Sequence, residues 1–86
     1  MSTRRYPVVI EQTATGYSAY SPDVLSCIAT GDSEEDTRCN FQDALLAHFE
    51  VMREIGEEIP EPRTSVDYVE IAARLPTLKL PVLDQY

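Results

Sequence analysis

The sequence has 86 residues, which is enough for one domain and too few for two. Its hydrophobic and charged fractions, 43% and 26%, are those of a globular protein, so wholesale disorder is excluded. A net charge of −8 and a pI near 4.4 argue against a surface that neutralises phosphates with clustered Lys and Arg, and we expect no direct DNA binding.

The first third of the chain predicts three antiparallel strands. Residues 6–11 (YPVVIE) are rich in β-branched side chains and predict the first strand. A small, polar hairpin loop ending at Gly16 separates it from a second strand at residues 17–21. A Pro-Asp turn then precedes a third strand at residues 27–30.

A long amphipathic helix is predicted over residues 34–55. Ser33 can cap its first turn, where acidic residues also favour the positive end of the helix dipole. Gly56 is a natural terminator. Apolar positions recur at steps of three and four residues, as expected for one buried helix face. They are Phe41, Ala44, Leu45, His48, Phe49, Met52 and Ile55.

The rest of the chain predicts one more strand and a tail. Residues 57–63 form a proline-interrupted loop, and residues 66–71 (VDYVEI) predict a fourth strand. We assign residues 1–72 to a single α+β domain and residues 73–86 to an extended tail. A right-handed crossover then gives a β-β-β-α-β fold with a mixed four-stranded sheet in the order 3-2-1-4 and the helix on one face.

One helix covers only one side of such a sheet, while both sides carry apolar side chains. In the first strand Val8 and Ile10 share a face and Val9 points the other way. The second face, an edge strand or the tail should therefore contact another chain, which predicts a homo-oligomer, a dimer or a tetramer. The alternative is that the tail covers its own sheet in a monomer.

The candidate catalytic groups do not form an enzyme signature. His48 lies on the apolar stripe without a nucleophile and an orienting acid, so we interpret it as a partly buried structural residue. Nine acids and two arginines between residues 32 and 58 give a local charge of −7, either a solvated face or a patch for a basic partner. A residual nuclease would need Glu11, Asp67 and Glu70 to converge on metal ions, and the last two should point to opposite faces.

The remaining signals concern cysteines and targeting. Cys27 and Cys39 lack a metal-binding spacing, and we expect both to be free, buried and small hydrophobic in character. We expect no cofactor and no metal. The polar N-terminus lacks the apolar region of a secretory signal, and no apolar run is long enough to span a membrane, so the protein is predicted to be cytoplasmic.

The middle of the chain resembles the HicB family of antitoxins. That family shows an aromatic-bearing strand, a Pro-Asp turn, a small-residue segment and Gly-Asp-[Ser/Thr]-x-Glu opening a helix. The matching residues are Tyr17, Pro22, Asp23, Cys27, Ala29, Gly31, Asp32, Ser33 and Glu35. Residues 56–62 (GEEIPEP) resemble the family's Gly-x-x-Ile-Pro-x-Pro link to the last strand. The chain departs from the pattern at Ser26, where the family commonly has Gly, and at Asp36 or Thr37, where it has Ala.

The resemblance covers about residues 5 to 72 and implies a degenerate ribonuclease H-like domain without catalytic acids. It also implies homo-oligomers and a small basic HicA-type toxin, an mRNA-cleaving ribonuclease, blocked by direct masking. Residues 73–86 are too few for the family's C-terminal DNA-binding module. A stand-alone oligomeric interaction domain without a toxin is the alternative. Partner contacts are expected at Tyr17, Tyr20, Pro22 and Asp23.

Overall fold

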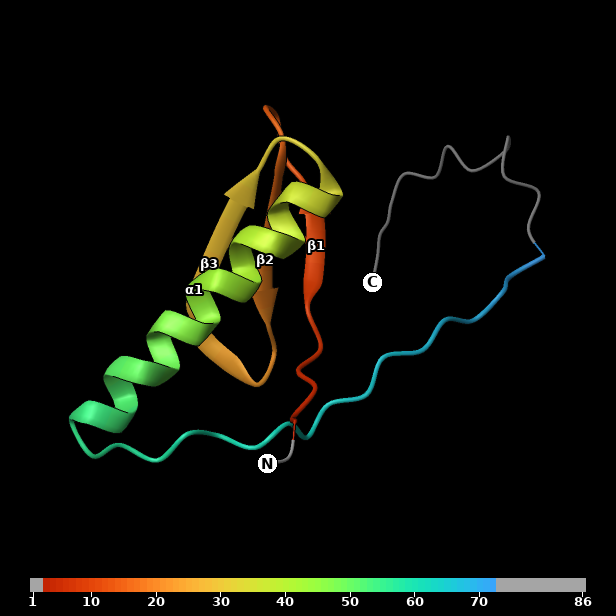
Figure 1. The fold of residues 1–86 in the computed structure, drawn as a ribbon. Helices are drawn as coiled ribbons and strands as arrows, with labels where there is room; N and C mark the ends of the chain where they lie inside the picture. Colours follow the sequence, from red (N-terminus) through yellow and green to blue (C-terminus); the bar gives the residue numbers. More distant parts are fainter. Residues whose placement is uncertain (1–2, 73–86) are drawn as a thin grey trace.

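The computed structural model describes residues 3–72 of the chain. Their elements follow the order β1 (Val9–Gln12), β2 (Tyr17–Ser21), β3 (Val24–Gly31) and α1 (Glu34–Glu54). The strands form an antiparallel meander with β2 in the middle, and α1 crosses one face of this sheet (Figure 1). The predicted α+β class is therefore confirmed.

Cross-strand register decides which side chains face the helix. Ile10 of β1, Ala19 of β2 and Ala29 of β3 lie opposite one another and therefore share a face. Ala19 is buried, and the other two side chains pack against the core. This row marks the side of the sheet that α1 covers.

A small cluster between the sheet and α1 forms the core. Two strands supply three of the buried apolar side chains, and α1 supplies the other two from positions four residues apart. The buried members are Ala19, Val24, Cys27, Phe41 and Leu45. The core is small even for a chain of this size, so stability depends strongly on each of its members.

Both ends of α1 form as the sequence predicts. The Ser33 side chain accepts a hydrogen bond of 3.0 Å from the backbone N–H of Asp36, which satisfies one free donor of the first turn. At the other end Gly56 adopts a left-handed φ of 81°, and the N–H of Glu57 returns to the carbonyl of Met52 at 2.8 Å.

The first and third strands each start three residues from their predicted positions. β1 begins at Val9 and not at residue 6. β3 begins at Val24 and not at residue 27, because the turn after β2 is tighter than expected. The pairing of β2 with β3 is irregular between Tyr20 and Ser21. Only two residues, 22 and 23, connect the two strands.

The expected fourth strand is the main difference in topology. Residues 66–71 are extended but pair with no strand among residues 3–72, and the sheet there has the order β1-β2-β3. The segment passes the N-terminal end of β1 and then leaves the body of the domain (Figure 1). The predicted tail, residues 73–86, lies outside the described residues.

Candidate protein-interaction site

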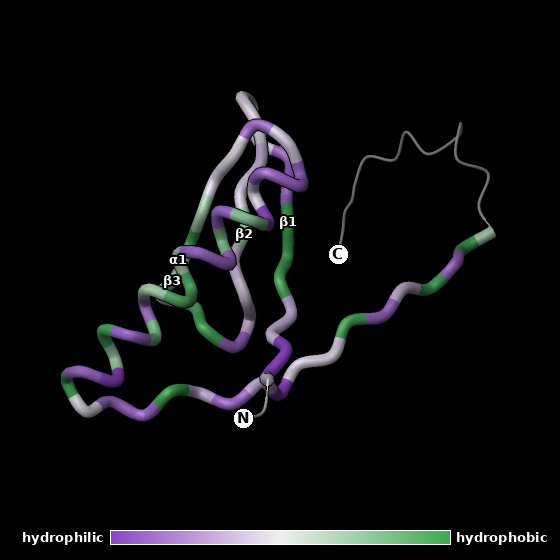
Figure 2. Tube along the Cα trace, viewed as in Figure 1, coloured by the Kyte–Doolittle hydropathy of each residue, from purple (hydrophilic) through white to green (hydrophobic). Residues whose placement is uncertain are grey.

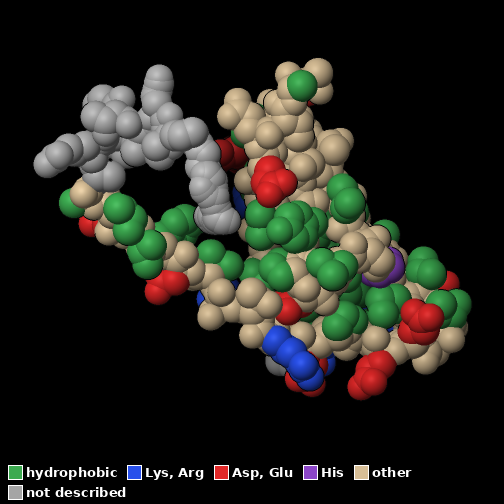
Figure 3. Space-filling view, turned by 180° about the vertical axis from the view of Figure 1, so that it is seen from behind, with side chains coloured by type: hydrophobic (Ala, Val, Ile, Leu, Met, Phe, Trp, Pro, Cys, Tyr) green, Lys and Arg blue, Asp and Glu red, His purple; other side chains and the backbone are tan. Residues whose placement is uncertain are grey.

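The face of the sheet opposite α1 carries an apolar row. Val9, Tyr20 and Ile28 lie opposite one another across the three strands, on the side that α1 leaves uncovered. The Ile28 side chain is 67% exposed, and Leu25 at the start of the same strand is 71% exposed. Seen from behind α1, hydrophobic side chains gather over this part of the sheet (Figure 3). We call it the open face.

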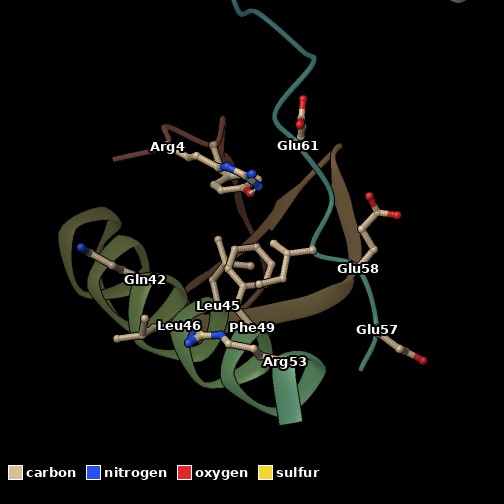
Figure 4. A pocket seen from close by; sticks show the side chains of 11 residues that line it. Arg4, Gln42, Leu45, Leu46, Phe49, Arg53, Glu57, Glu58 and Glu61 are labelled. Atoms are coloured by element: carbon tan, nitrogen blue, oxygen red, sulfur yellow. Dashed lines mark hydrogen bonds between the residues drawn. The ribbon is translucent and has the colours of Figure 1, made fainter. Parts of the chain in front are cut away.

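A second apolar surface is a groove beside α1. Leu45, Leu46 and Phe49 of α1 and Ile59 of the following loop line a hollow of about 610 Å³. The residues at its rim are charged: Arg4, Arg53, Glu57, Glu58 and Glu61. Figure 4 shows the apolar side chains at the centre and the three glutamates along the chain that follows α1. We call it the α1 groove.

Hydrogen bonds to Asp23 fix the course of the chain after α1. The Asp23 carboxylate accepts bonds from the backbone N–H groups of Arg63 (3.1 Å) and Thr64 (3.2 Å), and from the Thr64 hydroxyl (2.8 Å). Nearby, the Tyr6 hydroxyl donates to the carbonyl of Pro60 at 2.6 Å. We call the contacts between Asp23, Arg63 and Thr64 the clasp.

The clasp also sets the ionisation of Asp23. Desolvation acts to raise the pKa of this carboxyl, but the hydrogen bonds from Thr64 and Arg63 stabilise the charged form and outweigh it. The pKa of Asp23 therefore lies below its ordinary value of 3.8. The carboxylate is thus charged at neutral pH, and both of its oxygens accept hydrogen bonds from its own chain.

The four residues predicted to contact a partner fall into different environments. Tyr20 lies on the open face, whereas Tyr17 lies opposite Gly31 on the side of α1. Pro22 and Asp23 form the turn between β2 and β3, next to the loop that follows α1. The structure therefore brings Pro22 and Asp23 together and separates the two tyrosines.

Two long-range contacts of the chain after α1 were not predicted. Thr64 lies 41 residues from Asp23, and Pro60 lies 54 residues from Tyr6, whose hydroxyl donates to its carbonyl; no local pattern indicates such bonds. Pro60 belongs to the Ile-Pro-x-Pro link that carries part of the family resemblance. That motif was the one sequence feature that could have indicated a fixed position for this part of the chain.

His48 is half-buried, as predicted, and makes one contact that was not predicted. Its Nε2 lies 3.0 Å from the Ser26 hydroxyl, and the ring packs beside Phe49. A serine becomes a nucleophile only when a base and a third, orienting group act together. Within residues 3–72, no hydrogen bond links the other ring nitrogen of His48 to a carboxylate.

The cysteines confirm one expectation and correct another. Both are free. Cys27 is buried in the core, and this burial raises the pKa of its thiol. Cys39 is exposed on α1, so the expectation that it is buried was wrong, because it lies on the outer side of the helix.

The acidic residues between residues 32 and 58 lie on the surface. All nine acids between residues 32 and 58 are exposed. Over the described part of the chain, no three acidic, histidine or cysteine side chains lie close enough together to hold a metal ion. No helix between residues 3 and 72 is long and apolar enough to cross a bilayer.

This acidic domain of one sheet and one helix can be placed in a class by its sequence. Residues 6–74 match the family model described as the HicB-like antitoxin of bacterial toxin–antitoxin systems. The match covers the strands, the helix and the clasp. The chain belongs to the HicB-like antitoxin family, which confirms the resemblance seen in the sequence.

Three curated proteins are similar to this chain. Antitoxin HicB 2 of Photorhabdus laumondii subsp. laumondii is 36% identical over 72 residues, which cover 83% of this chain and 52% of that protein. An uncharacterized 14.9 kDa protein in the rep-hol intergenic region of Haemophilus phage HP1 is 34% identical over 64 residues, covering 74% and 48%. Antitoxin HicB 1 of the same Photorhabdus is 36% identical over 69 residues, covering 78% and 44%.

The chain therefore spans about half the length of the curated relatives it matches. No solved structure matches it.

Proposed function

We propose that this protein is the antitoxin of a HicA-type toxin, an mRNA-cleaving ribonuclease, and that it neutralises the toxin by direct masking without catalysis of its own. Membership of the HicB-like antitoxin family supports a toxin as the partner. The two Photorhabdus relatives are named antitoxins, although this chain spans only about half of each. Operator binding is not part of the proposal.

The exposed acidic surface is the observation that supports masking most directly. The stretch from residue 32 to residue 58 holds nine exposed acids and only two arginines, Arg38 and Arg53. A surface of this charge attracts a basic protein over a Debye length and orients it before contact. A ribonuclease that binds RNA phosphates has a basic surface of the required kind.

The partner contacts need an apolar anchor as well as charge, because rim charges alone contribute mainly to the association rate. Tyr20 on the open face and Pro22 in the neighbouring turn are the predicted contact residues best placed to serve as one. For Asp23 we propose an indirect role, since the clasp already uses both of its carboxylate oxygens. Tyr17 would act near the start of α1.

We propose further that the protein acts as a homo-oligomer. The apolar row of the open face and the unpaired outer edge of β1 both support association of copies. A ribonuclease H-like sheet would in addition require a fourth strand beside β1. A stand-alone oligomeric interaction domain remains the second candidate, and these same two surfaces favour it.

The test uses the product of a short, basic reading frame adjoining the gene for this protein. We expect that product to cleave RNA in vitro and to stop doing so when the 86-residue chain is added in excess. Reversing the charge at Glu50 and Glu54, both exposed on α1, should weaken binding about tenfold and reduce its salt dependence.

Thr15→Lys provides the control, because Thr15 is exposed in the loop between β1 and β2, away from Tyr20 and away from the acidic face of α1 on which Glu50 and Glu54 lie. Its binding should stay within about twofold of the unchanged chain. Undiminished RNA cleavage in the presence of excess protein would contradict the antitoxin role. Equal losses in the control and in the α1 variant would contradict the assignment of the acidic face.

A further inference from the structure

Residues 66–71 form an apolar, extended segment that has no partner strand among residues 3–72. Val66, Tyr68, Val69 and Ile71 are between 55% and 87% exposed. The segment leaves the domain in an extended conformation, and hydrophobic residues recur along it (Figures 1 and 2). Four exposed apolar side chains in one short segment are unusual unless another surface covers them. We call residues 66–71 the exit segment.

The outer edge of β1 is equally unpartnered. Among the described residues β1 pairs with β2 alone, so its other edge presents free backbone donors and acceptors. Between α1 and the residues that lead into β1 lies a hollow of about 490 Å³ whose apolar lining includes Val8, Phe41 and Leu45. A strand added along β1 and the residues before it would turn every second side chain toward this hollow.

Arginines surround that hollow although the chain as a whole is strongly acidic. Arg4, Arg5 and Arg38 line it and are all exposed, which is three of the seven basic residues of the chain. A basic toxin would be repelled at this place, whereas a segment carrying carboxylates would be attracted. The exit segment carries two, Asp67 and Glu70.

We propose that the exit segment of a second copy of this chain adds to the β1 edge, and that the two copies exchange these segments reciprocally. Val69 and Ile71 share one face of the segment and cover the hollow beside Val8. Asp67 lies on the same face and meets the arginines at its rim. Tyr68 lies on the other face and extends the apolar row that begins at Val9.

The clasp fixes where the exit segment starts. It holds Thr64 against the turn after β2, and Thr64, Ser65 and Val66 lie beside Arg5 to Pro7, before β1 begins. From this point the segment departs with its side chains in solvent. A six-residue strand spans about 20 Å, enough to follow β1 along its whole length.

Reciprocal exchange also closes the assembly. Each copy gives one segment and receives one, so two-fold symmetry pairs the β1 edge of both copies and closes the exchange at a dimer. This inference deepens the homo-oligomer part of the proposed function and does not depend on the toxin.

The test measures the mass of the full chain by sedimentation and light scattering across the micromolar range. We expect twice 9.7 kDa for the unchanged protein. Val69→Lys with Ile71→Lys should give a folded monomer, because both residues are exposed outside the core and the arginines around the hollow would repel the added lysines. Ile55→Lys, at an exposed position at the end of α1, is the matched control and should remain a dimer.

A charge exchange separates direct contact from a general effect. Asp67→Arg and Arg38→Asp should each weaken the dimer about tenfold, and the double variant should recover most of that loss. Failure of the double variant to recover would overturn the assigned contact. A monomeric unchanged protein, or a dimer that persists with Val69→Lys and Ile71→Lys, would overturn the exchange itself.

Failure of the strand exchange can be distinguished from failure of the antitoxin role. If the unchanged chain is a monomer and still blocks the toxin, only the exchange is wrong. If the Val69 and Ile71 variant dissociates the dimer but no form of the protein blocks the toxin, the exchange stands and the antitoxin role is wrong.

Discussion

Thr64 binds the carboxylate of Asp23 with both its backbone N–H and its hydroxyl, at 3.2 and 2.8 Å, across 41 positions of the sequence. This pair joins the turn between β2 and β3 to the chain that follows α1. It therefore determines where the exit segment starts and in which direction it can travel. The following predictions concern this pair, the core and the helix start.

Removing the carboxylate should release the chain after α1 without unfolding the domain. In Asp23→Ala, we expect the amide protons of Arg63 and Thr64 to exchange with solvent faster, because both lose their acceptor. Amides in the pairing of β2 with β3 should keep their protection. Hydrogen exchange followed by NMR measures both sets, and a uniform loss of protection would show that Asp23 supports the whole fold.

The clasp should also be sensitive to acid. Because the pKa of Asp23 is lower in the folded chain than its ordinary value of 3.8, the clasp contributes fully above about pH 4. Its contribution is lost as the pH falls through the lowered folded pKa, where the carboxyl becomes protonated. The Thr64 amide shift should titrate in this acid range, and the titration should be absent in Asp23→Asn.

Three helix positions should differ in stability according to their burial. Phe41 is buried, so Phe41→Ala should lower the free energy of unfolding by about 3–5 kcal/mol. Phe49 is only half-buried, its ring centroid 5.2 Å from that of Tyr6, and Phe49→Ala should cost about 1–2 kcal/mol. Leu46→Ala, at an exposed position, should stay within about 0.5 kcal/mol in urea unfolding. Equal effects at the three positions would contradict the burial pattern.

Gly31 should not tolerate a larger side chain. A Cβ atom there would lie 2.6 Å from the Thr37 hydroxyl oxygen and 2.8 Å from the Thr37 backbone nitrogen, so the start of α1 would have to shift. We expect Gly31→Ala to cost about 1–3 kcal/mol. Thr30→Ala, at the exposed neighbouring position, is the control and should cost much less. Thermal unfolding by circular dichroism compares the two.

The two thiols should differ in reactivity. Cys39 is exposed and should react with a thiol reagent in the folded protein at neutral pH. Cys27 is buried, and its raised pKa leaves little thiolate, so it should react only when the domain opens. In Cys39→Ser the fast phase of the reaction with the thiol reagent should disappear. Unfolding in urea should then make Cys27 reactive. A fast phase that survives the substitution would contradict the burial of Cys27.

The helix was predictable because all of its signals are local. The Ser33 cap, the spacing of Phe41 and Leu45 and the terminator Gly56 each act within one or two turns. The three strands were also found, but the start of β3 was misplaced. That start depends on the irregular pairing between Tyr20 and Ser21, and the pattern of either strand alone does not contain it.

The fourth strand and the clasp depend on contacts between distant residues. The β-branched and aromatic composition of residues 66–71 predicts a strand, but a strand exists only when a partner edge lies beside it, and none does among residues 3–72. The role of Asp23 likewise required knowing that Thr64 returns to the turn after β2. Of the predicted contact residues, only the position of Tyr20 on an exposed sheet face follows from the strand period alone.

The extended, solvent-exposed form of residues 66–71 is also the form in which proteases accept a peptide. A single copy with an uncovered exit segment would be cut there quickly, while its sheet and helix would survive as a trimmed core. Covering the segment removes the cleavage site. The lifetime of this protein in the cell would then rise with its own abundance.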